Sequence, residues 1–128
     1  MTADEIDALA TVFFRAIEAG DLDTVRRTYS PDAVVWHNYD DVEQRVEDNL
    51  VTLAFVVGAL ANRRYEDVRR TIVEDGFVQQ HVLRGEAPGG RLEMPAMMRV
   101  WVADDCITRI DEYLDPAQAR VLATPRPT

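Results

Sequence analysis

The sequence predicts an α+β fold in which N-terminal helices pack on one face of an antiparallel sheet. Three observations support this. Apolar residues recur at helical spacing in the first half of the chain, apolar and polar residues alternate from Arg64 onward, and short turn signals separate the alternating segments. With 128 residues, 47% of them hydrophobic and 29% charged, the chain is long enough for one domain with a core. We expect residues 1–123 to form this domain and residues 124–128 a loose tail.

The first helix is the most clearly marked element. Thr2 and Glu5 have the spacing of a capping box, in which each side chain accepts a hydrogen bond from the backbone of the other residue. Apolar residues then recur at helical spacing over residues 6–17. Gly20 is the residue type that commonly ends a helix, so the helix is expected to stop there.

Two more helices and one strand are expected before residue 64. Asp21 is a favourable cap for a short helix that ends at residues 30–31, Ser-Pro. β-branched and aromatic residues over 33–38 predict a short strand. Residues 40–43 are expected to begin a third helix, because apolar residues spaced three and four apart follow over 46–60.

Four strands joined by hairpins are expected in the second half of the chain. Pairs such as Asp75-Gly76 and Asp104-Asp105 give short turn signals between alternating segments. The expected strands are Tyr65–Glu74, Phe77–Arg84, Arg91–Ala103 and Cys106–Leu114, followed by a helical turn from Asp115 to Leu122.

Charge and composition exclude several classes of partner. The net charge is −9, so nucleic acid is not expected, because binding a phosphate backbone normally needs a basic face. The single cysteine, Cys106, cannot form an internal disulfide. The longest largely apolar stretch, residues 50–61, is shorter than the roughly 20 residues that span a bilayer. No secretion signal opens the chain, so we expect a cytoplasmic protein with no membrane partner.

No cofactor and no metal are expected. The chain has two histidines and no Cys/His cluster with the spacing of a metal site. Neither a glycine-rich phosphate loop nor a dinucleotide-binding fingerprint is present.

Alternation within the strands predicts which side chains face inward. One face of residues 94–102 is wholly apolar, so we expect it to face the helices or a ligand. Arg99 and Trp101 then lie on the outer face, where a second subunit could cover them. Gln79 and His81 share one face of their strand, but pattern alone does not decide which way that face points.

The order of elements resembles the nuclear transport factor two superfamily, which includes ketosteroid isomerases, limonene epoxide hydrolases and SnoaL-type polyketide cyclases. The resemblance rests on residues 19–23 (Ala-Gly-Asp-Leu-Asp), residues 31–35 (Pro-Asp-Ala-Val-Val) and residues 107–115, which include Glu112-Tyr113. It implies that the sheet is curved, with the helices on its concave face, and forms a cone that encloses an apolar pocket for a small hydrophobic molecule, commonly within a homodimer. Because this fold hosts many activities, the resemblance does not decide the function.

Two relatives place candidate site residues differently. Resemblance to the epoxide hydrolases puts their first-strand Tyr and Asn on Trp36 and Asn38, their Arg-x-Asp on Gln79 and His81, and their last-strand Asp on Glu112. The chemistry changes at most of these positions, so epoxide hydrolysis by that mechanism is doubtful.

Resemblance to the ketosteroid isomerases puts their helix tyrosine on Phe13, their base on His37 and their second acid on Met98. Both oxyanion donors are then absent, and isomerisation by that route is not expected. On a regular strand, either Trp36 and Asn38 face the pocket or His37 does.

The resulting hypothesis is a cofactor-free acid–base enzyme of the hydrolase, cyclase or isomerase type. His81 and Glu112 are expected to handle the proton, because a carboxylate can hold an imidazole in one tautomer. The residues expected to bind the substrate are Phe13, Trp36, His37, Asn38, Gln79, Met94, Met98 and Ile110. The alternative is a module that binds a small ligand or a partner without turnover.

Overall fold

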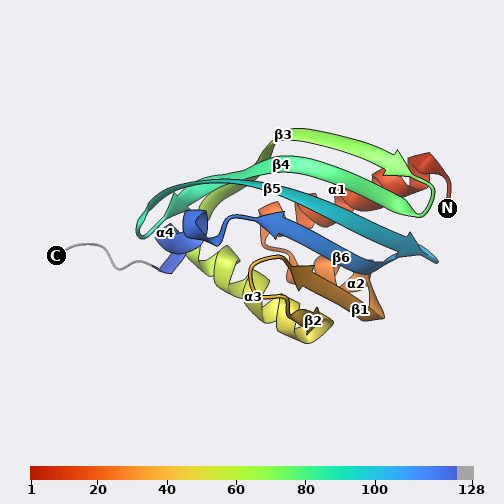
Figure 1. Cartoon of the computed structure of the whole chain (residues 1–128), viewed down its shortest axis with the longest axis horizontal. Helices are drawn as coiled ribbons and strands as arrows, with labels where there is room; N and C mark the ends of the chain where they lie inside the picture. Colours follow the sequence, from red (N-terminus) through yellow and green to blue (C-terminus); the bar gives the residue numbers. More distant parts are fainter. Residues whose placement is uncertain (124–128) are drawn as a thin grey trace.

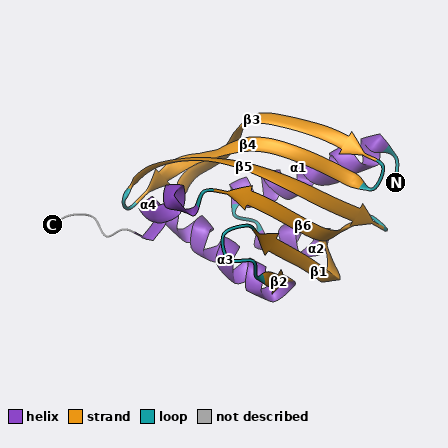
Figure 2. Cartoon of the chain, viewed as in Figure 1, coloured by secondary structure: helices purple, strands orange, loops and turns teal. Residues whose placement is uncertain are grey.

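The computed structural model describes residues 1–123, and Figure 1 shows the helices gathered on one side of a curved six-stranded sheet. The helices are α1 (Ala3–Ala19), α2 (Leu22–Thr28), α3 (Val46–Ala59) and α4 (Arg120–Ala123), with a 3-10 helix, η1 (Pro116–Ala119), before α4. The strands are β1 (Tyr29–His37), β2 (Glu43–Arg45), β3 (Ala61–Val73), β4 (Gly76–Ala87), β5 (Gly90–Ala103) and β6 (Cys106–Leu114). The predicted α+β class is confirmed, with helices and strands arranged as in Figure 2. The predicted tail, residues 124–128, lies outside the described residues.

The sheet is mixed, whereas the sequence predicts an antiparallel one. Its strand order is β2-β1-β6-β5-β4-β3, and β1 runs parallel to β6 while the other neighbouring pairs are antiparallel. The prediction is correct for β3 to β6, which short turns connect. β1 reaches the sheet from a distant part of the chain, so no hairpin turn sets its direction.

The segment predicted to begin the third helix forms a short strand instead. Residues 43–45 pair antiparallel with residues 34–36 of β1, and α3 begins only at Val46. The Asp40 carboxylate accepts a hydrogen bond at 3.0 Å from the backbone N–H two residues later. This acidic residue therefore stabilises a turn rather than a helix N-terminus.

The ends of the first two helices agree with the sequence signals. The Glu5 backbone N–H donates to Thr2 Oγ1 at 3.1 Å, and the Thr2 N–H donates to Glu5 Oε1 at 2.8 Å, which is a complete capping box. Gly20 ends α1 with a φ of 74°, a left-handed conformation that glycine adopts without steric cost. Asp21 caps α2 by accepting from the Thr24 N–H at 3.1 Å.

One arginine of β3 connects the C-termini of two helices. The Arg63 guanidinium donates to the carbonyl oxygens of Ile17 and Glu18 at the end of α1, both at 3.2 Å. It also donates to Val57 and Leu60 at the end of α3, at 2.8 and 2.6 Å. The last carbonyl groups of a helix have no hydrogen-bond partner inside the helix, and the helix C-terminus carries partial negative charge. A cation at this place therefore donates hydrogen bonds to the carbonyls and is attracted by the charge.

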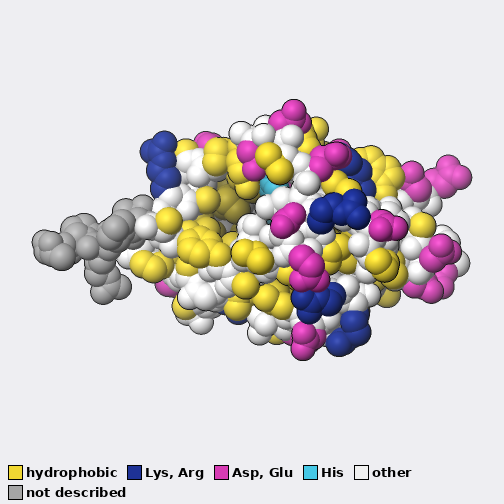
Figure 3. Space-filling view, turned by 90° about the horizontal axis from the view of Figure 1, so that it is seen from below, with side chains coloured by type: hydrophobic (Ala, Val, Ile, Leu, Met, Phe, Trp, Pro, Cys, Tyr) yellow, Lys and Arg dark blue, Asp and Glu magenta, His cyan; other side chains and the backbone are white. Residues whose placement is uncertain are grey.

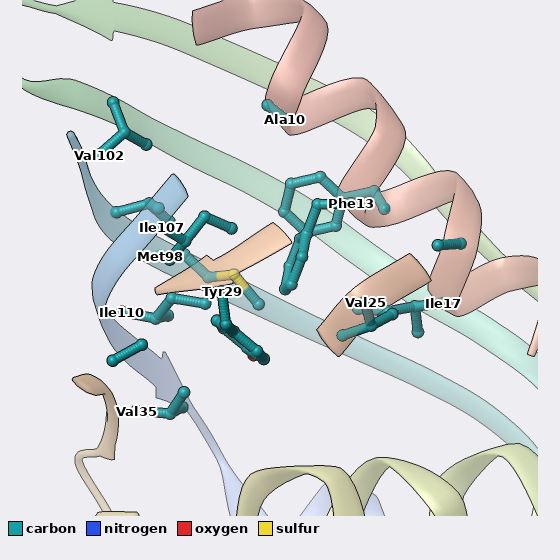
Figure 4. Close-up of a cluster of buried hydrophobic side chains, with 14 of the residues drawn as sticks. Ala10, Phe13, Ile17, Val25, Tyr29, Val35, Met98, Val102, Ile107 and Ile110 are labelled. Carbon is teal, nitrogen blue, oxygen red and sulfur yellow. The ribbon is translucent and has the colours of Figure 1, made fainter. Parts of the chain in front are cut away.

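The core lies between the helices and the inner face of the sheet. Met94, Met98, Val100 and Val102 of β5 are no more than 8% exposed, which confirms the predicted inward direction of this apolar face. Figure 4 shows Phe13 of α1 in the same cluster as Met98. The apolar face of β5 and helix α1 therefore belong to one continuous core.

Candidate functional site

A cavity of about 310 Å³ lies between the inner face of the sheet and helices α1, α3, η1 and α4. Its apolar lining residues are Phe13, Ile17, Val35, Leu53, Phe55, Val56, Leu83, Met94, Met98, Ile110, Leu114, Pro116, Ala119 and Leu122. Its polar lining residues are Tyr29, His37, Tyr39, Asn49, Thr52, Tyr65 and Glu112. Seen from below, Figure 3 shows hydrophobic side chains around a hollow, with histidine surface beside it. The size and lining are those of a site for a small, mainly apolar molecule.

Glu112 and His37 form a polar pair in the cavity wall. They stand opposite each other in the register of β6 and β1, and His37 Nε2 lies 3.0 Å from Glu112 Oε1. The side chain of Glu112 is 15% exposed, and that of His37 is 7% exposed. Residues in register on neighbouring strands point to the same face of a sheet, so strand pairing itself brings this pair together.

The surroundings assign a role to each atom of the pair. His37 Nδ1 is the one buried side-chain polar atom without a hydrogen-bond partner among residues 1–123. A buried N–H without a partner is costly, and a carboxylate only accepts, so the favoured tautomer has the proton on Nε2, which donates to Oε1. Glu112 Oε2 makes no hydrogen bond within the described residues and is not among the buried unpartnered atoms. This second oxygen therefore faces the cavity.

Three tyrosines, Tyr29, Tyr39 and Tyr65, line the same cavity as the Glu112 carboxylate. The Tyr29 hydroxyl donates to Asn49 Oδ1 at 2.7 Å. Burial, and after it the charge of Glu112, raises the pKa of both Tyr29 and Tyr65. Burial is also the main cause that raises the pKa of Tyr39. All three therefore remain uncharged hydroxyls near a carboxylate at neutral pH.

His81 does not pair with Glu112, contrary to the sequence-based expectation. It lies on β4, opposite Ala96, and the whole of β5 separates its strand from β6. Its Nδ1 is 2.9 Å from Gln79 Nε2, and Gln79 Oε1 accepts from Arg70 Nε at 2.8 Å. Because an arginine can only donate, its partner on Gln79 is the carbonyl oxygen, and the NH₂ group of Gln79 therefore donates to His81 Nδ1. Since Nδ1 accepts this hydrogen bond, the proton of the neutral His81 ring is on Nε2. Both side chains face inward, at 3% and 0% exposure for His81 and Gln79.

The buried position of His81 predicts a pH dependence of stability. Burial lowers the pKa of His81, and the charge of Glu112 opposes this to a smaller extent. The unfolded chain then binds a proton at this position more readily than the folded chain. The free energy of unfolding is therefore expected to fall as the pH drops below about 6.5, the ordinary histidine value, and to be restored above it.

Urea unfolding between pH 8 and pH 5 tests this expectation. His81→Asn keeps an acceptor for the Gln79 amide but does not titrate in this range. As the pH falls, the variant is expected to lose less stability than the original chain. Parallel losses in both proteins would show that His81 does not cause the effect.

The structure selects one of the two arrangements that the sequence leaves open for the first strand. His37 is 5% exposed and lines the cavity. Trp36 points to the outer face, where its ring packs against Tyr113 with centroids 5.4 Å apart. Asn38 follows the end of β1 and accepts a hydrogen bond from the Leu114 N–H at 2.9 Å. Of these three candidates, His37 alone lines the cavity. The pairing of β1 with β6 is shifted between Tyr29 and Val34, but residues 34–37 pair with residues 109–112 without a further shift, so Trp36 and His37 point to opposite faces.

The other residues expected to bind the substrate either line the cavity or hold a neighbouring side chain in place. Five of the residues expected to bind the substrate line the cavity: His37, Phe13, Met94, Met98 and Ile110. Gln79 is buried but supports His81 rather than lining the cavity. Sequence reasoning missed Tyr29, Asn49 and Tyr65. The sequence contains one signal for Tyr65. This residue lies where the helical spacing of apolar residues ends and the alternation of a strand begins, and an aromatic side chain at that position can point its hydroxyl inward.

Two negative observations apply to residues 1–123. No three His, Cys, Asp or Glu side chains lie close enough together to hold a metal ion. None of the helices in this part of the chain has both the length and the apolar character needed to cross a membrane.

Comparisons with solved structures place this arrangement among known folds. AclR from Streptomyces galilaeus, a proposed hydroxylase, has a TM-score of 0.81 at 17% identity, over 99% of this chain and 91% of AclR. IdmH from Streptomyces antibioticus, a proposed polyketide cyclase, has a TM-score of 0.78 at 19% identity, over 91% of this chain and 96% of IdmH. A hypothetical protein from Catenulispora acidiphila with a ketosteroid isomerase-like fold, solved in complex with trimethylamine, has a TM-score of 0.71 at 13% identity, over 82% and 83% of the two chains.

Sequence comparison gives a more specific result than these distant structural similarities. No curated protein sequence matches the chain. The family model of the SnoaL-like domain, however, matches residues 10–110, which is most of the chain. The chain therefore belongs to the SnoaL-like domain family.

Proposed function

We propose that the chain is a cofactor-free acid–base enzyme of the cyclase or isomerase type that acts on a small hydrophobic molecule in the cavity. Glu112 is the base, and His37 holds its carboxylate in position. The main support is one observation. Glu112 has one oxygen hydrogen-bonded to His37 at 3.0 Å and the other facing an apolar cavity.

The proposed chemistry begins at a carbon next to a carbonyl group. Glu112 Oε2 takes a proton from this carbon, the C–H electron pair forms a new C=C bond, and the carbonyl oxygen gains the negative charge. Return of the proton to another carbon of the conjugated system gives an isomer. Alternatively, the enolate carbon attacks a second carbonyl of the same molecule, and the proton passes from Glu112 to the new alkoxide, which completes an aldol-type cyclisation.

The alternative is a module that binds its ligand without turnover. A Glu112 side chain neutralised by an arginine, or a His81 exposed to solvent, would favour that alternative. The pairing of Glu112 with His37 and the 3% exposure of His81 instead support the enzyme. The ketosteroid isomerase route is not proposed, because Phe13 and Met98 occupy the positions of its hydrogen-bond donors and cannot donate.

Deuterium exchange tests the proposal without knowledge of the natural substrate. The protein is incubated in D₂O with a set of enolisable aryl ketones, including 2-acetylnaphthalene, and loss of the α-proton signal is followed by NMR. We expect exchange faster than in buffer alone for at least one ketone that binds. Binding without any exchange would contradict the enzyme and leave the binding module.

We also propose that the outer face of the sheet pairs with a second copy of the chain. Met97 and Tyr113 stand directly opposite each other on β5 and β6, and they are 42% and 50% exposed. Trp36 packs against Tyr113, so the apolar surface extends over a third strand. Contiguous exposed apolar surface of this kind is typical of an interaction site.

Light scattering after size exclusion tests this pairing. The chain is expected to show twice its mass of 14.5 kDa, and Met97→Glu is expected to shift it toward the monomer. Val51→Glu is the matched control, because Val51 is 72% exposed on α3, away from this face. A monomeric original chain, or an equal effect of both substitutions, would contradict the proposal.

A further inference from the structure

The hydroxyl of Tyr65 is a hydrogen-bond donor without a partner in the cavity. It makes no hydrogen bond within the described residues, and it is not among the buried unpartnered atoms, so it remains open to the space that Tyr65 lines. The aromatic ring is fixed by edge-to-face contacts with Phe14 and His81, at centroid distances of 5.0 and 4.7 Å. A rigid phenol with a free O–H is therefore presented to the cavity.

The Tyr29, Asn49 and Thr52 side chains of the lining already make hydrogen bonds within the protein. The Tyr29 hydroxyl donates to Asn49, whose amide donates to Gln44 at 3.3 Å. Thr52 Oγ1 accepts from Gln44 at 3.1 Å and donates to the carbonyl of Asp48 at 3.3 Å. The hydroxyls of Tyr65 and Tyr39 are then the lining hydroxyls without a hydrogen-bond partner within the described residues. Tyr39 is 45% exposed, whereas Tyr65 packs against the core, so Tyr65 is the donor better placed to meet an oxygen of a bound molecule.

The charge of the lining restricts the ligand further. Glu112 is a carboxylate in the cavity wall, and no arginine is found among the described residues that line the cavity. The chain contains no lysine. An anionic ligand would face a like charge without a compensating cation, whereas an uncharged ligand would not.

We propose that the cavity binds an uncharged carbonyl compound whose oxygen accepts a hydrogen bond from the Tyr65 hydroxyl, and that it rejects a carboxylate of the same shape. This assignment names the substrate class for the proposed function, and its catalytic consequence rests on that function. In the reaction proposed above, the Tyr65 hydroxyl would stabilise the oxygen that gains negative charge when Glu112 takes the proton. The binding preference itself does not depend on turnover.

Three ligands of matched shape test the proposal: 2-acetylnaphthalene, 2-ethylnaphthalene and 2-naphthoate. Their dissociation constants at pH 7 are measured by fluorescence titration for the original chain and for Tyr65→Phe. We expect Tyr65→Phe to weaken binding of the ketone by roughly three- to tenfold, the range of one neutral hydrogen bond, and to leave the hydrocarbon unaffected. Naphthoate should bind at least about tenfold more weakly than the ketone, and Glu112→Gln should narrow this gap.

Tyr29→Phe is the matched comparison, because the Tyr29 hydroxyl in the same cavity already donates to Asn49. Circular dichroism confirms that each variant is folded. Equal binding of ketone and naphthoate, no ketone binding, or a ketone-specific loss in Tyr29→Phe instead of Tyr65→Phe would overturn the proposal. The measured quantity is the dissociation constant. If the preference for the ketone depends on Tyr65 but the protein does not catalyse deuterium exchange, only the proposed function is overturned.

Discussion

Glu112→Gln is expected to reduce ketone α-proton exchange by about 10²- to 10⁴-fold, the range over which a positioned general base contributes. Glutamine nearly preserves the volume of the side chain, and its carbonyl oxygen can still accept from His37 Nε2 at the position of Oε1. Its amide group does not take up a proton, so the base is lost while the cavity is kept. NMR exchange rates measured at equal protein concentration give the effect directly.

Asp111→Asn is the matched control for this experiment. Asp111 is the preceding residue of β6, points to the outer face, and accepts a hydrogen bond from Arg109 Nε at 2.7 Å. The Asp111→Asn variant is expected to catalyse ketone proton exchange at the same rate as the original chain. His37→Gln, which keeps an N–H donor, is expected to lose less activity than His37→Phe. Full activity in Glu112→Gln, or a similar loss in Asp111→Asn, would show that Glu112 is not the base.

The sequence predicts the fold well where the information is local. The capping box of Thr2 and Glu5, the stop at Gly20 and the apolar face of residues 94–102 each depend on neighbours a few positions apart. Errors occur where a distant partner decides the structure. Residues 43–45 form a strand because residues 34–36 offer a free edge, and the parallel pairing of β1 with β6 has no turn that would reveal it.

The same distinction explains the candidate site. Alternation places His81 and Gln79 on one face of their strand, and the family resemblance, not the pattern, predicts that this face points inward, as it does. Alternation also does not indicate which strand lies beside β6. The partner of Glu112 is His37, 75 residues away, and a shift of one residue in β1 would have turned Trp36 inward instead. Site residues on one strand are therefore predictable from the sequence, whereas their partners depend on register between strands that are far apart in the chain.

Arg63→Met is expected to lower the free energy of unfolding by about 3 kcal/mol. The substitution keeps most of the side-chain volume but removes the donors for four helix-terminal carbonyls, and a hydrogen bond to a charged group contributes about 1.5–3 kcal/mol. Water can form some of the hydrogen bonds that the guanidinium gives up, so the loss of stability is smaller than the sum of the four bonds.

Urea unfolding measures the change in the free energy of unfolding, with Arg64→Met as the matched control. Arg64 is the next residue, its side chain is 40% exposed, and its ion pair with Glu66 lies at the surface, so a change below about 1 kcal/mol is expected. Equal effects at both positions would mean that Arg63 does not hold α1 and α3 at the cavity.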